Sequence, residues 1–215
     1  ITGFQGVTPQ GDLTTLGRGG SDTSAVAIAA KAGAPCEIYS DVPGIFTCDH
    51  NKVKGARRLD YITYGEMLEL ASLGAKVLHM RSVELARKYG VELYCASTFS
   101  EERGTYVVKQ LPEWMESPVV TGVTVARNQM KFVVKRIPGN GDVLSGIFHV
   151  LALAGVNIDM ISTATDEELS FLTFTVLYGD ADVVTKAVAD YMNSHGLRGW
   201  GIEPGVPVAK VSAVG

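Results

Sequence analysis

The sequence predicts an α/β protein of one or two domains. Apolar stretches with strand character alternate with stretches whose apolar residues recur every three or four positions, which favours helices packed on both faces of a sheet. In the second half, the order strand, helix, strand, strand, helix, strand is that of a ferredoxin-like split βαβ fold. The 215 residues are 46% hydrophobic and 20% charged, a composition that suits a globular chain of this size.

Composition and charge exclude several classes of function. The formal net charge is −4, and the sequence has no basic stripe that would neutralise nucleic-acid phosphates. No apolar run approaches the ~20 residues that span a bilayer, and no secretory signal opens the chain. Cys36, Cys48 and Cys95 lack metal-ligand spacing. We therefore expect reduced thiols in a cytoplasmic protein that binds neither nucleic acid nor membrane and has no metal site of its own.

The elements of the first half follow from turn and cap signals. Turn formers at 8–12 separate two strands, Gly33 and Gly90 are typical ends of helices, and Thr63 with Glu66 predicts a capping box. His79 and Glu66 are expected to be structural. The expected strands are 1–7, 13–16, 35–42, 45–47, 91–98 and 104–108, and the expected helices are 24–33, 63–74 and 82–89.

A polar stretch with two prolines around Trp114 is the expected linker to the second half. Asp142 is expected to cap a helix that Gly155 ends, and Asp180 or Asp182 is expected to start another. The expected strands are 119–125, 131–137, 156–163, 169–177, 196–202 and 208–214.

The most informative stretch is Leu16-Gly17-Arg18-Gly19-Gly20-Ser21-Asp22-Thr23, a glycine-rich turn that leads into a helix. Ser21 and Asp22 are good helix N-caps. Glycines allow close approach of the backbone, and the amides of a helix start attract anions. Arg18 adds a forked cation suited to a carboxylate or a phosphate. From these residues alone, an anion site and an ordinary strand–turn–helix connection remain equally open.

Three motifs, in this order, resemble aspartate kinases. They are the glycine turn, the stretch Glu37–Thr47 (EIYSDVPGIFT) and the stretch Tyr64–His79 (YGEMLELASLGAKVLH). The resemblance extends over nearly the whole chain and implies the C-terminal lobe of a three-layer α/β/α amino-acid kinase domain. The implied divisions are 1–108 for this lobe, 109–118 for a linker, 119–130 for a strand of a second regulatory module, 131–205 for a regulatory domain, and 206–215 for a further strand of the second module.

The resemblance implies phosphoryl transfer from ATP to the side-chain carboxylate of L-aspartate, an early step in lysine, threonine and methionine biosynthesis, with Mg²⁺ as cofactor. Such transfer depends on positioning and charge stabilisation. By this likeness Asp22 is catalytic and orients groups around the phosphoryl. The implied aspartate-binding residues are Arg18, Gly19, Gly20 and Ser21, and the implied ATP-binding residues are Ser40, Asp41, Phe46, Lys76 and Val77.

The turn at 138–142 and the later stretch Gly155–Ile161 (GVNIDMI) resemble an ACT domain, a regulatory module that binds small molecules. The resemblance implies a homo-oligomer joined through such modules, with lysine or threonine as effector. The implied effector-binding residues are Asn140, Asp142, Val143, Leu144, Asn157, Ile158 and Asp159. Helix-start amides and Asn157 suit a carboxylate, and Asp159 suits an ammonium group. The alternative is that 157–159 is an ordinary turn.

The sequence also departs from the family pattern. Asn51 and Met80 stand where an arginine and a proline are usual, which puts a phosphate contact at Asn51 in doubt. A segment of the Lys-Phe-Gly-Gly-Thr-Ser type is missing, and both ends fall in strands. We therefore expect an internal piece of a longer polypeptide, inactive by itself. The alternatives are a non-catalytic regulatory subunit of an aspartate kinase and, less favoured by Arg18 and Asp22, another amino-acid kinase.

Overall fold

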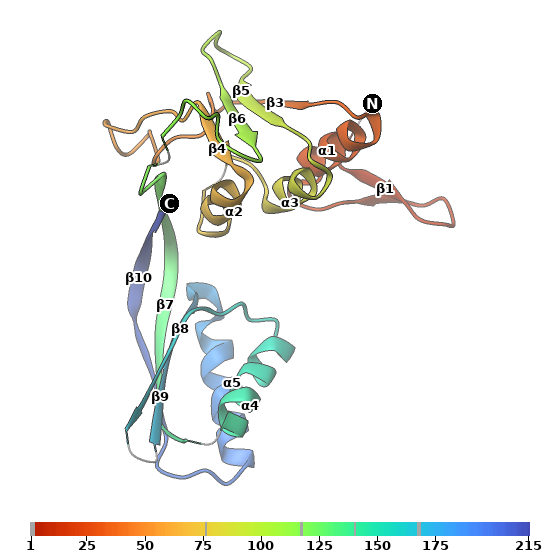
Figure 1. Ribbon diagram of the computed structural model, residues 1–215. Helices are drawn as coiled ribbons and strands as arrows, with labels where there is room; N and C mark the ends of the chain where they lie inside the picture. The colour runs from red at the N-terminus through yellow and green to blue at the C-terminus, as the bar shows by residue number, and fades with distance from the viewer. Residues whose placement is uncertain (1–2, 76, 117, 140, 167–168) are drawn as a thin grey trace. The chain divides into compact units, whose positions relative to one another are not determined.

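The computed structural model describes residues 3–75, 77–116, 118–139, 141–166 and 169–215. The chain forms two compact units (Figure 1). Unit 1 comprises Ile1–Val125 and Val211–Gly215, and unit 2 comprises Ala126–Lys210. Two long strands, β7 (Gly122–Pro138) and β10 (Gly201–Val214), have residues in both units.

Unit 1 begins with an antiparallel hairpin and continues with a four-stranded mixed sheet. The hairpin pairs β1 (Gln5–Val7) with β2 (Leu13–Thr15). The sheet has the order β3-β5-β6-β4, in which β3 and β5 are parallel, β5 and β6 antiparallel, and β4 and β6 parallel. The elements are β3 (Cys36–Ser40), β4 (Tyr61–Thr63), β5 (Leu93–Ser97) and β6 (Thr105–Val108), with helices α1 (Gly20–Ala32), α2 (Tyr64–Ser72) and α3 (Met80–Tyr89).

The three described helices of unit 1 pack against the same face of this sheet, not against both faces as predicted (Figure 1). Val26 of α1, Met67 of α2 and Val83 of α3 are fully buried with Leu93 and Val107 of the sheet. Side chains alternate between the two faces of a strand. The opposite face consequently carries a row of rings, Tyr39, Tyr94, Tyr106 and Tyr61, whose successive centroids lie 6.4, 4.6 and 5.3 Å apart.

Unit 2 has the predicted βαββαβ order. Its elements are β7, α4 (Gly141–Leu153), β8 (Asp159–Asp166), β9 (Leu169–Leu177), the short 3-10 helix η1 (Tyr178–Asp180), α5 (Ala181–Ser194) and β10. The sheet order is β10-β7-β9-β8. Phe132 and Phe174 stack at 5.7 Å in a core that Ile147 and Leu151 of α4 and Val188 of α5 complete. The mixed α/β fold class is confirmed.

Two breaks between strands were predicted wrongly. The predicted strands at 119–125 and 131–137 form one strand, β7, which begins at Gly122, because Asn128 takes a positive φ of 58° and the chain passes through a local irregularity without turning. Likewise, 208–214 continues the single strand β10 from Gly201, so that Pro204 and Gly205 lie within a strand. The predicted strand at 156–163 starts later, at Asp159.

Turn and cap signals predicted the ends of helices better than the apolar pattern predicted the lengths of strands. Gly33, Gly90 and Gly155 all have a positive φ at helix ends, as expected. Thr63 and Glu66 form the predicted capping box. The cap predicted at Asp142 is wrong, because α4 begins at Gly141 and Asp142 lies in its first turn. Among the described helices, none combines the length and apolar character needed to cross a membrane.

Candidate functional site

The glycine turn closes through backbone conformations that glycine adopts readily. Gly17 and Gly19 have φ values of 72° and 73°, in the left-handed region. The amide of Gly20 donates to the carbonyl of Gly17 at 3.0 Å. Gly19 is the N-cap residue of α1, so the caps predicted at Ser21 and Asp22 are wrong. Because the left-handed glycine starts the helix early, both residues lie in its first turn.

The carbonyl groups of the turn are directed into the protein. Arg81 of α3 donates from Nη2 to the carbonyl of Leu16 at 2.9 Å and to the carbonyl of Arg18. The carbonyl of Gly19 accepts from the amide of Thr23 at 3.1 Å and from its hydroxyl at 2.8 Å. The hydroxyl of Ser24 donates to the carbonyl of Gly20 at 2.7 Å. Every carbonyl from position 16 to position 20 therefore has a donor.

Unlike the carbonyl groups of the turn, the amide groups at the start of α1 are not all bonded within the protein. The first amides of a helix have no partner within that helix. In the described part of the chain no side chain caps the N-terminus of α1. The amides of Ser21 and Asp22 therefore remain for an external acceptor, and the helix dipole favours a negative one. Arg18 is exposed beside them. This turn has the chemistry of a carboxylate or phosphate site.

Gly19 also lies directly against His79. A Cβ atom at position 19 would approach Cγ of His79 to 2.2 Å. His79 is the N-cap residue of α3, and its Nδ1 accepts from the amide of Arg81 at 3.3 Å. The first turn of α3 thus supports the glycine turn, and position 19 requires glycine for both its backbone conformation and its space.

Asp22 is half-buried and faces the sheet. Burial raises the pKa of the Cys95 thiol to about 12, and the nearby charge of Asp22 acts in the same direction. Burial and then Asp22 also raise the pKa of the Cys36 thiol. Both thiols are therefore protonated and unreactive at neutral pH. Asp22 is the acidic residue in the first turn of α1, and its catalytic role stays a prediction.

The topology brings two of the predicted nucleotide residues, Ser40 and Asp41, to the same edge as the turn. Only 33–35 separate α1 from β3, and the helix packs on the strand, so α1 runs back along β3. With about 1.5 Å per helical residue and about 3.3 Å per strand residue, both elements are roughly 16–20 Å long. The N-terminus of α1 consequently lies near the carboxyl end of β3, whose last residue is Ser40 and which Asp41 follows. Ligands of α/β sheets bind at such edges.

The nucleotide residues differ in how they are held. The Ser40 hydroxyl accepts from the amide of Val42 at 3.1 Å, whereas Asp41 is exposed. Phe46 is half-buried and stacks on His50 with centroids 4.4 Å apart. Val77 packs against the core of unit 1. Lys76 lies outside the described residues.

The predicted effector residues lie at two places in unit 2. Asp142 is exposed in the first turn of α4, whereas the side chains of Val143 and Leu144 pack in the core, so only their backbone faces outward. Asn157 is exposed, and Ile158 packs against the core. Asn140 lies outside the described residues.

Asp159 already has a cationic partner. Its carboxylate accepts from Nζ of Lys210 and from the amide of Met160 at 2.7 Å. These hydrogen bonds, that from Lys210 first, hold the pKa of the Asp159 carboxyl below its usual value. An effector ammonium group would have to share Asp159 with Lys210 or replace it.

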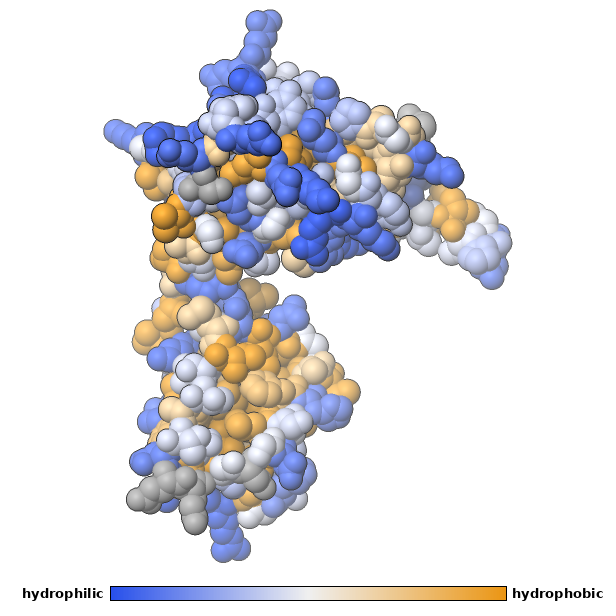
Figure 2. Space-filling model, in the orientation of Figure 1, coloured by the Kyte–Doolittle hydropathy of each residue, from blue (hydrophilic) through white to orange (hydrophobic). Residues whose placement is uncertain are grey.

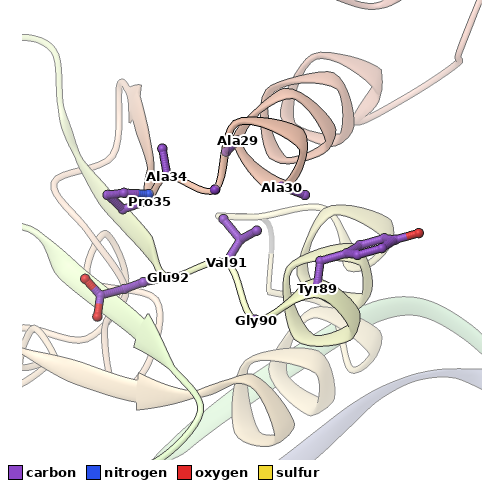
Figure 3. A pocket seen from close by; sticks show the side chains of 9 residues that line it. Ala29, Ala30, Ala34, Pro35, Tyr89, Gly90, Val91 and Glu92 are labelled. Carbon is purple, nitrogen blue, oxygen red and sulfur yellow. The ribbon is translucent and has the colours of Figure 1, made fainter.

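A pocket of about 360 Å³ lies at the other ends of α1 and α3 (Figure 3). Ala29, Ala30 and Val91 are among the lining residues, with Glu92 at its border. None of the predicted site residues lines it. The glycine turn is a surface site rather than a deep cavity.

Sequence reasoning missed Arg81. It is exposed in the first turn of α3, and its partner Leu16 is 65 positions away in the sequence. The sequence did contain one signal. A cation near a helix N-terminus is disfavoured by the helix dipole, which indicates that the cation binds a partner outside its own helix.

Comparisons with known proteins match the chain to kinases that act on amino acids. Residues 1–97 match the model of the amino acid kinase family. All of this chain aligns with the aspartokinase of Bacillus sp. (strain MGA3), at 44% identity over 217 residues. Over its whole length the chain is therefore similar to aspartate kinases. It spans 52% of that relative, or about half its length.

Solved structures of aspartate kinases share its fold. Aspartokinase III of E. coli, in complex with lysine and aspartate, gives a TM-score of 0.74 at 30% identity, covering 98% of this chain and 46% of that one. The same enzyme in complex with aspartate and ADP gives a TM-score of 0.75 at 28% identity, covering 98% and 47%. The predicted resemblance to aspartate kinases is confirmed, and the roles of individual site residues stay predictions.

Proposed function

We propose that this chain carries the aspartate-binding turn and nucleotide-binding segments of an aspartate kinase. The reaction transfers the terminal phosphoryl group of ATP to the side-chain carboxylate of L-aspartate. The observation that supports this most is the glycine turn, whose carbonyls all have donors within the protein while the first amides of α1 lack a cap. An oriented set of amides beside Arg18 fits a carboxylate substrate.

Asp22 is proposed to orient the reacting groups. It lies in the same helical turn as the free amides, so a carboxylate bound there would stand next to it. A carboxylate acceptor is already a nucleophile at neutral pH, so Asp22 need not remove a proton. Its role is to position the phosphoryl group and its counterions, as phosphoryl transfer requires.

ATP is proposed to bind beyond the carboxyl end of β3, at Ser40, Asp41, Phe46 and Val77. Mg²⁺ usually binds through one or two carboxylates together with substrate phosphates and water. Asp22 and Asp41 fit that pattern, and the described residues contain no cluster of three acidic, histidine or cysteine ligands. Mg²⁺, when bound with ATP, would neutralise charge that develops on the phosphates.

The native full-length protein tests this proposal. Incubation with ATP, Mg²⁺ and L-aspartate should release ADP and form an acyl phosphate that hydroxylamine traps as a hydroxamate. Asp22→Asn should lower kcat by at least about a hundredfold, the range seen when one electrostatic group of a site is removed. Glu69→Gln, on the exposed face of α2, is the control. Effector binding without turnover in the wild-type protein would favour a non-catalytic regulatory subunit instead.

Unit 2 is proposed to bind the amino-acid effector, lysine or threonine, and to join copies of the chain in the cytoplasm. β8 is an edge strand, and all of its residues are exposed, including Met160 and Ile161. Apolar atoms also gather over α4 and α5 (Figure 2). Uncovered apolar edges favour pairing with a second copy. Ile161→Lys should lower the oligomeric state in analytical ultracentrifugation, and titration with each amino acid identifies the effector.

A further inference from the structure

Arg81 occupies a position that its own helix disfavours. It is the second residue of α3, after the N-cap His79, and α3 has no acidic residue in its first turn. The N-terminus of a helix carries partial positive charge, which repels a cation. Arg81 therefore does not stabilise α3, and its place has to be explained by the groups that it contacts.

Those groups are two carbonyls of the glycine turn. Nη2 of Arg81 donates to the carbonyl of Leu16 at 2.9 Å and also to the carbonyl of Arg18. These carbonyls flank Gly17, whose φ is positive and around which a Cβ atom would meet nothing within 4 Å. Because Gly17 has no side chain and open space around it, steric contacts place little limit on rotation of the 16–17 peptide. The guanidinium group restricts that rotation from outside the turn.

The direction of these carbonyls matters for an anion. If the 16–17 or the 18–19 peptide turned over, the carbonyl oxygen of Leu16 or Arg18 would exchange places with the amide of Gly17 or Gly19. That oxygen would then turn toward the anion site at the amides of Ser21 and Asp22. The negative end of the dipole would then repel the ligand. By holding both carbonyls, Arg81 keeps the turn in the arrangement in which its amides and the Arg18 side chain face an anion.

We propose that Arg81 is a positioning residue for aspartate, which acts through the backbone of the glycine turn and touches neither substrate. The proposal rests on the proposed function. The planar guanidinium group of an arginine can donate to two carbonyls in a fixed geometry, whereas a lysine carries a compact charge on a flexible side chain. Arg81→Lys should therefore restore the turn only in part.

The experiment compares Arg81→Met, Arg81→Lys and Arg87→Met in the native full-length protein. Arg87 is an exposed arginine in the last turn of the same helix, so its variant controls for loss of a surface charge. Arg81→Met should raise the KM for aspartate about tenfold, equivalent to ~1.4 kcal/mol, with the KM for ATP within about twofold of wild type. The KM for aspartate of Arg81→Lys should lie between those of wild type and Arg81→Met, and that of Arg87→Met should match wild type.

Hydrogen exchange supplies a readout that does not require turnover. Arg81→Met should speed exchange in peptides that cover residues 13–23, and Arg87→Met should not. Unchanged exchange in this segment, or an equal rise in the KM values for aspartate and ATP, would overturn the proposal. Failure of the wild-type protein to phosphorylate aspartate would overturn the proposed function, whereas the exchange result would still decide whether Arg81 holds the turn.

Discussion

The ammonium group of Lys210 is bonded to the carboxylate of Asp159, which links β10 to the start of β8. The two partners are unequally exposed, at 7% for the Lys210 side chain and 51% for that of Asp159. Removing the partner of a buried charge lowers the free energy of unfolding more than removing the partner of an exposed charge. Asp159→Asn should therefore destabilise unit 2 by about 1–3 kcal/mol, and Lys210→Met by less than about 1 kcal/mol.

The two tryptophans allow this difference to be measured in unit 2 itself. Trp200 packs against the core of unit 2, whereas Trp114 belongs to unit 1. In a Trp114→Phe background, urea unfolding followed by Trp200 fluorescence reports on unit 2. Equal losses for the two variants, or a larger loss for Lys210→Met, would contradict the assignment of a buried ammonium group.

Asp159 also makes stability depend on pH in a defined direction. The hydrogen bond from Lys210 lowers the pKa of this carboxyl in the folded protein below its ordinary value of 3.8. The unfolded state therefore binds more protons in this range. The contribution is fully present above the unfolded pKa and is lost as the pH falls through the folded pKa. Urea midpoints measured from pH 6 to pH 3 should fall less steeply for Asp159→Asn than for wild type.

Glu66 connects α2 to the start of β7. Its carboxylate accepts from the amide of Thr63 at 2.9 Å, from the Thr63 hydroxyl at 2.6 Å and from the hydroxyl of Thr121. Although burial acts in the opposite direction, the bonds from Thr121 and Thr63 hold its pKa below the usual value. Glu66→Ala should cost about 1–2 kcal/mol. Amide hydrogen exchange in α2 should become faster in Glu66→Ala. In the control variant Glu69→Ala, which changes an exposed residue of the same helix, the exchange should stay unchanged.

The capping box illustrates what the sequence can predict. Thr63 and Glu66 are three positions apart, so residue types alone specify their contact. Glycines at helix ends act in the same local way, and Gly33 and Gly90 end α1 and α3 as predicted. The βαββαβ order follows from hydrophobic periodicity and was also predicted correctly.

What could not be predicted depends on contacts between distant segments. The strands β7 and β10 run through residues that usually break a strand, Asn128 and Pro204, because each pairs with its neighbour over a long stretch. The early start of α1 at Gly20 requires the left-handed Gly19. The resemblance singled out the residues of the glycine turn, but Arg81, which holds that turn, comes from another helix.

Position 19 should tolerate no side chain. In Gly19→Ala the new methyl group would have a positive φ, at a cost of about 1–2 kcal/mol, and would also collide with His79. Gly17→Ala is a matched control, because Gly17 has nearly the same φ but nothing within 4 Å of a Cβ atom. We expect Gly19→Ala to raise the KM for aspartate severalfold more than Gly17→Ala. Equal effects of the two variants would mean that His79 does not limit this position.

The central claim is that the glycine turn binds the carboxylate of aspartate through its amides and Arg18. Isothermal titration calorimetry of the native full-length protein with L-aspartate, for wild type and Arg18→Gln, tests it most directly. Loss of a charge-assisted hydrogen bond costs about 1.5–3 kcal/mol, so Arg18→Gln should bind aspartate at least about tenfold more weakly. Binding of ADP should be unchanged. Equal affinity of both proteins for aspartate would contradict the account.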